Sequence, residues 1–142
     1  MADTTGTLHV EVVSADRVVW SGESSGVVAR TVDGDLGVLP GHSPVLALLV
    51  PSACEIITAT GGREIVAVDG GFISVAGGHV SILSEFAQLG AELSVADAER
   101  ELAQAERMLD DADPGNDDEA RTMLARAQAQ LKAAHKATTS SH

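Results

Sequence analysis

Basic and aromatic side chains are both scarce in this chain of 142 residues. Nine lysines and arginines stand against 21 aspartates and glutamates, a formal net charge of −12, and the aromatic residues are one Trp and two Phe. Proteins that bind nucleic acid rely on basic patches and on aromatic platforms for base stacking. Adsorption to an anionic membrane surface likewise needs clustered Lys and Arg. The composition therefore excludes a free-standing nucleic-acid binder and a protein that binds anionic lipid directly.

Cysteine and long apolar runs are also nearly absent. Cys54 is the single cysteine, so no internal disulfide can form, and a reducing compartment is expected. The longest apolar run, Val45 to Val50, is far shorter than the roughly 20 residues that a membrane-spanning helix needs. We therefore expect no direct lipid insertion, and any association with a membrane would pass through a partner protein.

Residues 7–88 carry the pattern of short β-strands. Leu8, Val10 and Val12 alternate with His9 and Glu11, the period of two that is typical of a half-buried strand. Similar apolar segments follow, separated by clusters of Gly, Pro, Asp and Ser that supply turn conformations. Many short strands with regular turns predict an antiparallel sandwich or barrel. Because aromatics are so few, β-branched and leucine side chains must fill its core.

The period changes at Ser94, where two helices are expected. Ser94 and Asp97 have the spacing of a capping box. Two apolar stripes then recur at steps of three and four, separated by turn-forming residues 110–116, and Asn116 with Glu119 would cap the second helix. The pattern predicts an antiparallel helical hairpin over residues 91–137 and a disordered tail over residues 138–142. The stripes consist of Val95, Ala98, Leu102, Ala105 and Leu109, and of Ala120, Leu124, Ala127, Leu131 and Ala134.

Alanine dominates both stripes, which bears on how firmly the hairpin packs against the sandwich domain of residues 1–90. An alanine methyl buries much less apolar area than a leucine, whose full burial contributes roughly 1.5–3 kcal/mol. Docking of the hairpin on the sandwich is therefore expected to be marginal. A hairpin that detaches and a hairpin that packs permanently are both compatible with this pattern.

Recognisable motifs of catalysis and metal binding do not occur. The sequence has no Gly-Lys-Ser/Thr phosphate loop and no Gly-x-Ser-x-Gly elbow, and its five histidines are scattered without the close pairing of a metal site. We expect neither an enzyme, nor a metal site, nor a bound cofactor. One segment stands out, because residues 33–46 place three glycines and two prolines around Asp33, Asp35 and His42. Such a segment is either a solvated double turn or a loop-borne docking site.

This segment resembles the signature of the epsilon subunit of bacterial F-type ATP synthase. That signature is an acidic-Gly-acidic-Leu-Gly segment leading into Pro-Gly-His-Ala/Ser-Pro, and the chain matches it from Asp33 to Pro44. Trp20-Ser21-Gly22 and Gly70-Gly71-Phe72 also agree, and the resemblance covers about residues 7–136. It implies a β-sandwich of roughly ten strands followed by two antiparallel helices.

The resemblance also implies a role. The family's epsilon subunit catalyses nothing itself: it sits in the central stalk of the rotor, binds the gamma subunit and the c-subunit ring, and couples proton flow to ATP synthesis. Such a protein lies peripherally at the cytoplasmic face of the cell membrane. Its helical hairpin is regulatory, compact against the sandwich in one state and extended towards the alpha and beta subunits in another, where it inhibits ATP hydrolysis. Carried over by position, the c-ring docking loop comprises Asp33, Asp35, Pro40, His42 and Pro44.

Some members of that family hold ATP through an Ile-Asp-x-x-Arg-Ala motif at the start of the first helix, together with basic residues on the second. The aligned residues here are Leu93, Ser94, Asp97 and Ala98. Serine replaces the aspartate of the motif, and Asp97 replaces its arginine, so a carboxylate would repel the phosphate oxygens. We predict that this chain does not bind ATP at physiological affinity.

Net charge is distributed unevenly along the chain. Residues 1–119 carry a net charge of −16, whereas residues 120–142 carry +4 and no acid. These bases are either a solvated helix face, favoured near the helix C-terminus, or a surface that engages an acidic partner. In the family, the segment of the beta subunit that faces the second helix is acidic. The basic residues of this regulatory helix are Arg121, Arg126, Lys132 and Lys136.

Two other classes of function fit parts of the sequence. A stand-alone binding adaptor with the same sandwich and hairpin would explain the fold but not the signature between Asp33 and Leu46. A small hydrolase or isomerase working from Asp33, Asp35 and His42 is a more distant alternative. Co-purification with gamma and c subunits would test the adaptor, and activity of the isolated chain would be the evidence for the enzyme.

Overall fold

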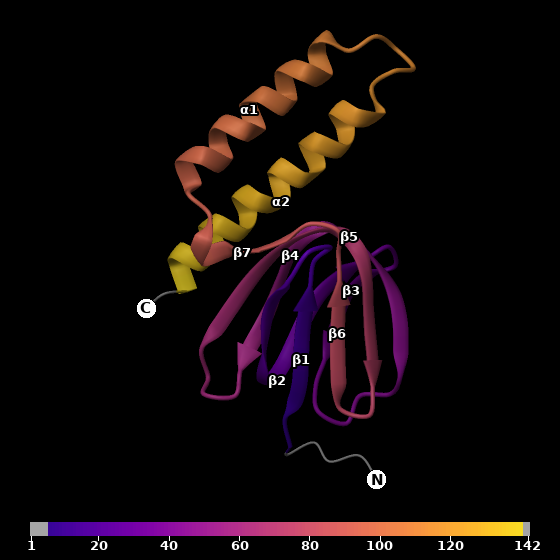
Figure 1. The fold of residues 1–142 in the computed structure, drawn as a ribbon, viewed down its shortest axis with the longest axis vertical. Helices are drawn as coiled ribbons and strands as arrows, with labels where there is room; N and C mark the ends of the chain where they lie inside the picture. The colour runs from indigo at the N-terminus through magenta and orange to yellow at the C-terminus, as the bar shows by residue number, and fades with distance from the viewer. Residues whose placement is uncertain (1–5, 141–142) are drawn as a thin grey trace.

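The computed structural model describes residues 6–140, with the side chains of residues 139 and 140 left out of that description. Seven β-strands come first, and a short 3₁₀ turn and two α-helices follow (Figure 1). The strands are β1 (Leu8–Val13), β2 (Val18–Thr31), β3 (Gly34–Val38), β4 (Val45–Thr58), β5 (Arg63–Ala76), β6 (His79–Leu83) and β7 (Ala87–Leu89). The turn is η1 (Gly90–Glu92), and the helices are α1 (Val95–Asp111) and α2 (Asp118–Ser140).

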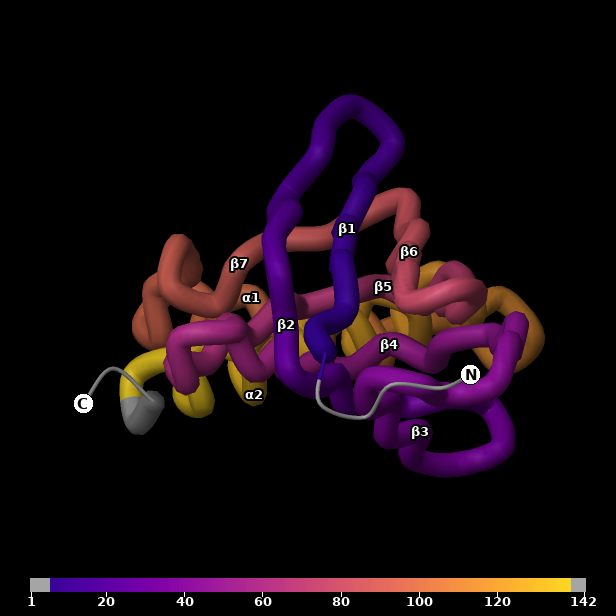
Figure 2. Tube along the Cα trace, turned by 90° about the horizontal axis from the view of Figure 1, so that it is seen from below, coloured from indigo at the N-terminus to yellow at the C-terminus, as the bar shows by residue number. Residues whose placement is uncertain are grey.

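The strands form one sheet that closes on itself as a flattened sandwich. Six of them follow the order β1-β6-β5-β4-β2-β3, and β7 pairs with β5. β1 also pairs with β2, which closes the ring and leaves β3 at an edge. β1 and β6 run parallel, whereas the other pairings within residues 6–140 are antiparallel. Seen from below, the ribbon of β1 and β2 projects beyond the other strands (Figure 2). The expected fold class, a β-sandwich followed by a two-helix hairpin, is confirmed.

The expected number of roughly ten strands is wrong, because β2, β4 and β5 each run for 14 residues. β4 continues through Pro51, and β5 continues through Gly70 and Gly71, where the sequence indicated turns. Pro51 pairs in register with Asp69, so the two strands bend together instead of reversing. Glycine is required at this bend: Gly71 has a φ of +100°, and a Cβ there would collide with the carbonyl of Leu83.

Aliphatic side chains fill the centre of the sandwich, as expected from the scarcity of aromatics. Leu8, Ile56, Ile73 and Ile82 are completely buried there. Cys54 lies in the same core, and burial raises the pKa of its thiol to about 12. A thiol that stays protonated at neutral pH is a poor nucleophile, so Cys54 serves the packing of the core.

Of the two hydrogen bonds in the capping box predicted at the start of α1, only the one accepted by Ser94 is confirmed. The Ser94 hydroxyl accepts a hydrogen bond of 3.2 Å from the Asp97 N–H, as in a capping box. The Asp97 carboxylate does not turn back to Ser94; it pairs with Arg100 one turn further along the helix. An exposed arginine at that spacing offers the carboxylate a charged partner.

α2 begins at Asp118, so the cap predicted at Asn116 is wrong. The Asn116 N–H donates to the Asp113 carbonyl (3.0 Å) and closes the turn between the helices. The first helical hydrogen bond runs instead from the Arg121 N–H to the Asp117 carbonyl (2.9 Å). The Arg121 side chain also donates to the Asp117 carboxylate (2.7 Å), which ties down the first turn.

The end of α2 differs from the expected disordered tail. The helix runs to Ser140, and the Thr138 hydroxyl donates to the Ala134 carbonyl (2.9 Å). No glycine or proline follows Asn116, so nothing in residues 138–140 interrupts the helical hydrogen bonds. Residues 141 and 142 of that predicted tail lie outside the described residues.

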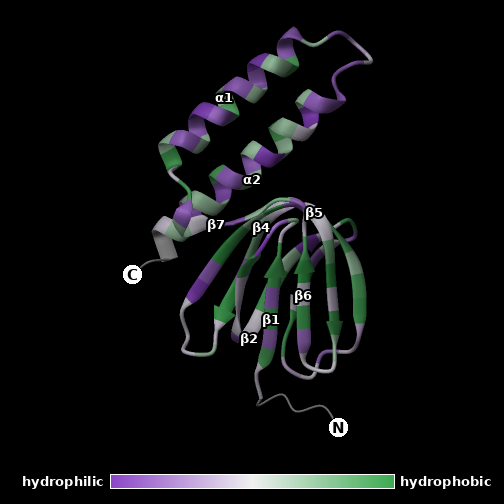
Figure 3. Cartoon of the chain, in the orientation of Figure 1, coloured by the Kyte–Doolittle hydropathy of each residue, from purple (hydrophilic) through white to green (hydrophobic). Residues whose placement is uncertain are grey.

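α2 lies between α1 and the sandwich (Figure 1) and is buried on more than one side. Ala133 packs on Ile65 and Ala67 of β5, whereas the sequence indicated only one apolar stripe. Both helices show apolar and polar bands along their length (Figure 3). Neither is long and apolar enough to cross a membrane, for the residues described. The buried residues of α2 are Ala120, Ala127, Ala129, Gln130, Ala133 and Ala134.

Candidate functional site

The segment predicted as one docking loop is divided by a strand. Asp33 lies in the turn between β2 and β3, and Asp35 lies on β3 itself. Pro40, His42 and Pro44 belong to the loop between β3 and β4, of which Pro40 is buried and Pro44 exposed. Three residues of β3, 36–38, lie between Asp35 and this loop and span roughly 10 Å. The structure therefore brings the two acids together but does not bring His42 next to them.

Asp35 is engaged by charges of its own chain. Arg30 on the neighbouring strand donates a hydrogen bond of 2.9 Å to its carboxylate. That hydrogen bond and the positive charge of Arg30 hold the pKa of Asp35 below its usual range, and Lys132 and Lys136 of α2 lower it further. The same groups line a cavity of about 220 Å³ at the seam between α2 and the sandwich. Asp35 therefore lies within electrostatic reach of the hairpin.

Arg126 anchors α2 to the sandwich. Its Nη2 and Nε atoms donate to one carboxylate oxygen of Asp69 at 2.6 and 3.1 Å. The guanidinium also lies over the ring of Phe86, 5.2 Å from the centroid. The Asp69 side chain is only 10% exposed, so loss of the arginine would leave a nearly buried carboxylate without its ion pair.

Lys136 makes a second ionic contact near the end of α2. Its ammonium donates to Glu55 on β4 at 2.8 Å, and Arg63 reaches the other oxygen of the same carboxylate at 3.5 Å. Arg121 pairs with Asp117, the residue just before its own helix. Two of the four basic residues singled out in the sequence therefore meet an acidic surface, and that surface belongs to the sandwich of the same chain.

The residues aligned with the ATP motif line a small cavity of about 170 Å³. The Ser94 hydroxyl is already bonded to the N–H of Asp97, whose carboxylate is paired with Arg100. Glu92 and Glu101 complete the acidic wall, and no lysine or arginine is among the described residues that line this cavity. A phosphate group placed there would meet three carboxylates, of which Asp97 is paired with Arg100 and Glu92 with Arg17.

An apolar row crosses the part of the sheet that α2 leaves open, and the sequence analysis missed it. Leu48 pairs with Phe72, Phe72 pairs with Leu83, and the Val32 N–H donates to the Leu48 carbonyl (3.0 Å). All four side chains are exposed, as is Leu46 on the same strand as Leu48. The sequence did carry a signal for this row. Every residue of the run 45–50 is apolar, whereas apolar and polar residues alternate in a half-buried strand.

These features define the class of protein. A closed sandwich with a helical hairpin held on one part of it and a row of exposed apolar side chains on another has the form of an interaction subunit. Within the described residues no group of three or more His, Cys, Asp or Glu side chains is placed to hold a metal ion.

Comparison with known proteins names the family. The model of the family "ATP synthase, Delta/Epsilon chain, beta-sandwich domain" matches residues 7–90, which is more than half of the chain. The chain therefore belongs to the delta/epsilon chain family of ATP synthase. The match ends where the sandwich gives way to η1 and the hairpin.

Curated relatives match about half of this chain. The chain is 57% identical over 67 residues to the ATP synthase epsilon chain of Cutibacterium acnes, which covers 47% of this chain and 46% of the relative. It is 60% identical over 67 residues to that of Streptomyces griseus (47% and 54% covered) and 60% identical over 68 residues to that of Frankia casuarinae (47% and 79%). The chain spans about half the length of the first two curated relatives that it matches.

Solved structures share the fold over nearly the whole chain. A chain of the Euglena gracilis mitochondrial ATP synthase (OSCP/F1/c-ring) superposes with a TM-score of 0.80 at 21% identity, covering 94% of this chain and 84% of that one. A chain of the Tetrahymena thermophila mitochondrial ATP synthase (central stalk/c-ring) gives a TM-score of 0.56 at 14% identity, with 92% and 96% covered. At these identities the likeness concerns the fold alone, and that fold includes the hairpin.

Proposed function

We propose that this protein is the non-catalytic epsilon subunit of a proton-translocating F-type ATP synthase. In this role it is part of the central stalk, binds the gamma subunit and the c-subunit ring, and couples rotor movement to ATP synthesis. It lies peripherally at the cytoplasmic face of the cell membrane through the complex. The family match over residues 7–90 and the names of the curated relatives support the proposal.

The exposed apolar row is the observation that carries the partner-binding part of this proposal. Val32, Leu48, Phe72 and Leu83 are between 42% and 59% exposed, and Leu46 is 73% exposed. Large apolar side chains gathered on one face of a sheet are stabilised when a partner removes them from water. We assign this face to the gamma subunit, because a protein–protein interface has an apolar centre.

The c-ring contact is assigned to the exposed polar groups of the signature. Asp33 and Asp35 are exposed near one end of β3, and His42 and Pro44 lie beyond its other end. The carboxylates of Asp33 and Asp35 would pair with basic residues of c-subunit loops. Pro40 is buried, so its part is to shape the loop.

Co-purification tests the partner assignment. Leu48→Asp places a charge in the centre of the apolar row and should prevent assembly with the gamma subunit and the c-subunit ring. Thr60→Asp adds the same charge in the exposed turn between β4 and β5 and should assemble normally. If both variants assemble equally well, the row is not the interface. If the unsubstituted protein fails to assemble at all, the stand-alone adaptor is the better description.

The hairpin is assigned a regulatory role. In the closed arrangement Arg126 and Lys136 pair with Asp69 and Glu55 of the sandwich. Release of the hairpin would free the same bases to engage an acidic surface of the alpha and beta subunits, where the hairpin would inhibit ATP hydrolysis. Exchange of one set of acids for another costs less than exposure of unpaired charges.

Truncation tests the regulatory role. An enzyme assembled with a chain that ends after Ala91 should hydrolyse ATP faster than the enzyme with the full chain. The apolar row and the signature lie before that point, so assembly should be unaffected. Unchanged hydrolysis together with unchanged synthesis would remove the regulatory assignment and leave the structural one intact.

A further inference from the structure

Two histidines that lie far apart in the sequence become neighbours on the outer face of the sheet. His9 lies near the start of β1 and His79 at the start of β6, and the parallel pairing of these strands places them in register. The next residues, Val10 and Val80, also pair with each other and are buried inside the sandwich. Because successive side chains of a strand point to opposite faces, both imidazoles lie on the outside. Their ring centroids are 5.6 Å apart, and the ring planes are inclined at 71°.

Glu23 fixes the orientation of the His9 ring. It pairs with His9 from the other neighbouring strand, β2, and its Oε1 atom lies 3.3 Å from His9 Nδ1. An ionised carboxylate can only accept a hydrogen bond, so Nδ1 carries the proton and Nε2 keeps its lone pair. The Thr7 hydroxyl donates to the other carboxylate oxygen of Glu23 at 2.7 Å and holds the group in place. Histidines that ligate metals typically donate their second ring N–H to a carboxylate in this way.

His79 stands on a backbone that is equally well held. Gly77 and Gly78 form the tight turn before it, and both have a positive φ, +56° and +81°, as hairpin turns require. The His9 N–H donates to the Gly78 carbonyl (2.8 Å), which joins this turn to β1. Within residues 6–140 the imidazole of His79 makes no hydrogen bond. Its ring nitrogens are therefore available, and only side-chain rotation is needed for the two rings to converge on one point.

The separation of the rings suits a shared metal ion. Zn²⁺ takes imidazole nitrogens at about 2.0–2.1 Å, which places two ring centroids on one tetrahedral ion roughly 5 Å apart. The observed separation of 5.6 Å is close to that value. The His9 side chain is 42% exposed and that of Glu23 is 55% exposed, so an ion reaches the pair from solvent. Glu11 lies on the same face as His9, two residues further along β1, and adds negative charge that favours a cation.

We propose that His9 and His79 together bind one Zn²⁺ ion, through Nε2 of His9 and one ring nitrogen of His79. Glu23 is a positioning residue, which holds the His9 ring and its tautomer, and water fills the remaining coordination positions. This set is smaller than a metal centre of three or more protein ligands, which the described residues do not contain. Sequence spacing predicts no metal site from these histidines, because the pairing of β1 with β6 exists only in the fold.

The experiment is calorimetric titration of the metal-free full chain, without a polyhistidine tag, with Zn²⁺ as the probe. We expect saturable binding of one ion per chain at about 0.1 mM or below. His9→Asn and His79→Asn should each weaken it at least about tenfold, because a single imidazole loses the advantage of a second ligand on the same molecule.

The positioning role of Glu23 has its own measurement. Glu23→Gln should weaken Zn²⁺ binding about tenfold. Imidazole ¹⁵N resonances should show His9 protonated at Nδ1 in the unsubstituted chain and a mixture of tautomers in Glu23→Gln. Unchanged tautomers in that variant would overturn the positioning role.

His135→Asn is the matched control, because it removes an exposed histidine of α2 that lies in a different part of the fold. It should leave the affinity unchanged. Equal weakening by His135→Asn and His9→Asn, or full affinity in the double variant His9→Asn/His79→Asn, would show that the ion is held elsewhere and overturn the site. Absence of saturable binding would overturn it as well. Failure here leaves co-purification with the stalk subunits untouched, so the two proposals fail separately.

Discussion

Arg126 donates two hydrogen bonds to a single carboxylate oxygen of Asp69, a residue 57 positions earlier in the chain. This contact joins the middle of α2 to the bend of β5, where Asp69 pairs with Pro51. Because Asp69 is nearly buried, the contact holds the hairpin in one orientation as well as adding stability. It also gives the basic helix an acidic surface within its own chain.

Replacement of Arg126 by methionine should loosen the hairpin. The substitution keeps an apolar stem but leaves the Asp69 carboxylate without its ion pair, so the free energy of unfolding should fall by about 1–3 kcal/mol. Hydrogen exchange of the α2 amides would measure the loosening of the hairpin, and urea unfolding would measure the loss of stability. Arg121→Met breaks the local pair with Asp117 at the start of α2 and should cost about 0.5 kcal/mol or less. Equal effects of the two substitutions would contradict the anchoring role.

Gly90→Ala should push α2 away from η1. A Cβ at residue 90 would lie 2.6 Å from the Ala133 carbonyl oxygen and 3.1 Å from the Ala137 methyl. Such a contact forces a shift of the helix and should destabilise the closed hairpin by about 1–3 kcal/mol. Faster hydrogen exchange confined to the hairpin is the expected observation.

Gly37→Ala is the control for that substitution, since a Cβ on Gly37 would have no neighbour within 4 Å. This variant should leave the exchange rates of the hairpin amides as they are. Normal exchange in the Gly90→Ala chain would mean that η1 and α2 are less tightly packed than the structure indicates.

Glu23 should make the sandwich sensitive to acid. Hydrogen bonds from Thr7 and from His9, at 2.7 and 3.3 Å, hold the pKa of Glu23 below its ordinary value of 4.5. Because the folded pKa is the lower one, these contacts add stability above pH 4.5, and that stability is lost as the pH falls through the folded pKa. Urea unfolding midpoints measured against pH should therefore decline less steeply below pH 4.5 for Glu23→Gln. Parallel curves for the two proteins would contradict this.

ATP should not bind to the isolated chain at micromolar concentrations. The cavity at the aligned motif is lined by Glu92, Asp97 and Glu101, and these carboxylates repel phosphate. Isothermal titration should show no saturable heat with ATP. Reversal of charge by Asp97→Arg restores the residue type of the family motif at that position, so a gain of ATP affinity in this variant would support the electrostatic reason. Micromolar binding by the unsubstituted chain would refute the prediction.

Much of the architecture was predictable because it follows from local patterns. The alternation of Leu8, Val10 and Val12 and the helical spacing after Ser94 each depend on neighbours within a few residues, and both elements occur as expected. Pro51 and Gly71 predict turns from the sequence, because the same residue types occur in turns and in bent strands. Only pairing across β4 and β5 distinguishes a bend from a reversal.

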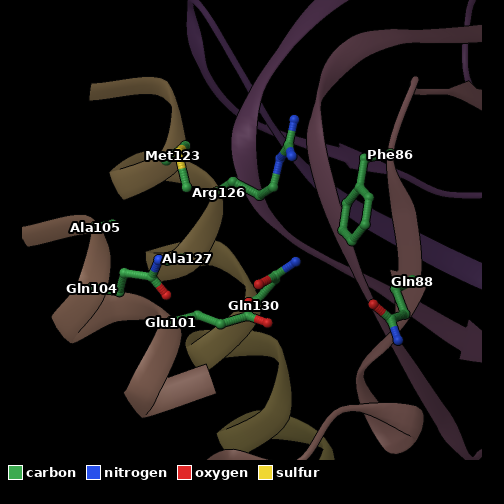
Figure 4. Close-up of a pocket in the computed structure, with 9 residues that line it drawn as sticks. All are labelled: Phe86, Gln88, Glu101, Gln104, Ala105, Met123, Arg126, Ala127 and Gln130. Atoms are coloured by element: carbon green, nitrogen blue, oxygen red, sulfur yellow. The ribbon is translucent and has the colours of Figure 1, made fainter. Parts of the chain in front are cut away.

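The candidate sites were less predictable. Asp35 and His42 are seven residues apart in a segment rich in turn formers, yet β3 keeps their groups at its two ends. Gln130 falls outside the apolar stripe of α2, yet it is only 7% exposed and lines a cavity together with residues of α1 and β7 (Figure 4). No local pattern marks a glutamine that will face a cavity.

Periodicity and composition alone were enough to predict an antiparallel sandwich or barrel, a helical hairpin with Ser94 capping its first helix, and an excess of acid over residues 1–119. They could not tell which acids would meet the bases of α2. Asp69 and Glu55 lie 57 and 81 residues away from Arg126 and Lys136, and the packing of α2 across β4 and β5 decides that they meet. Secondary structure is set by residues a turn or a strand apart, whereas ion pairs between distant elements exist only once the elements have docked.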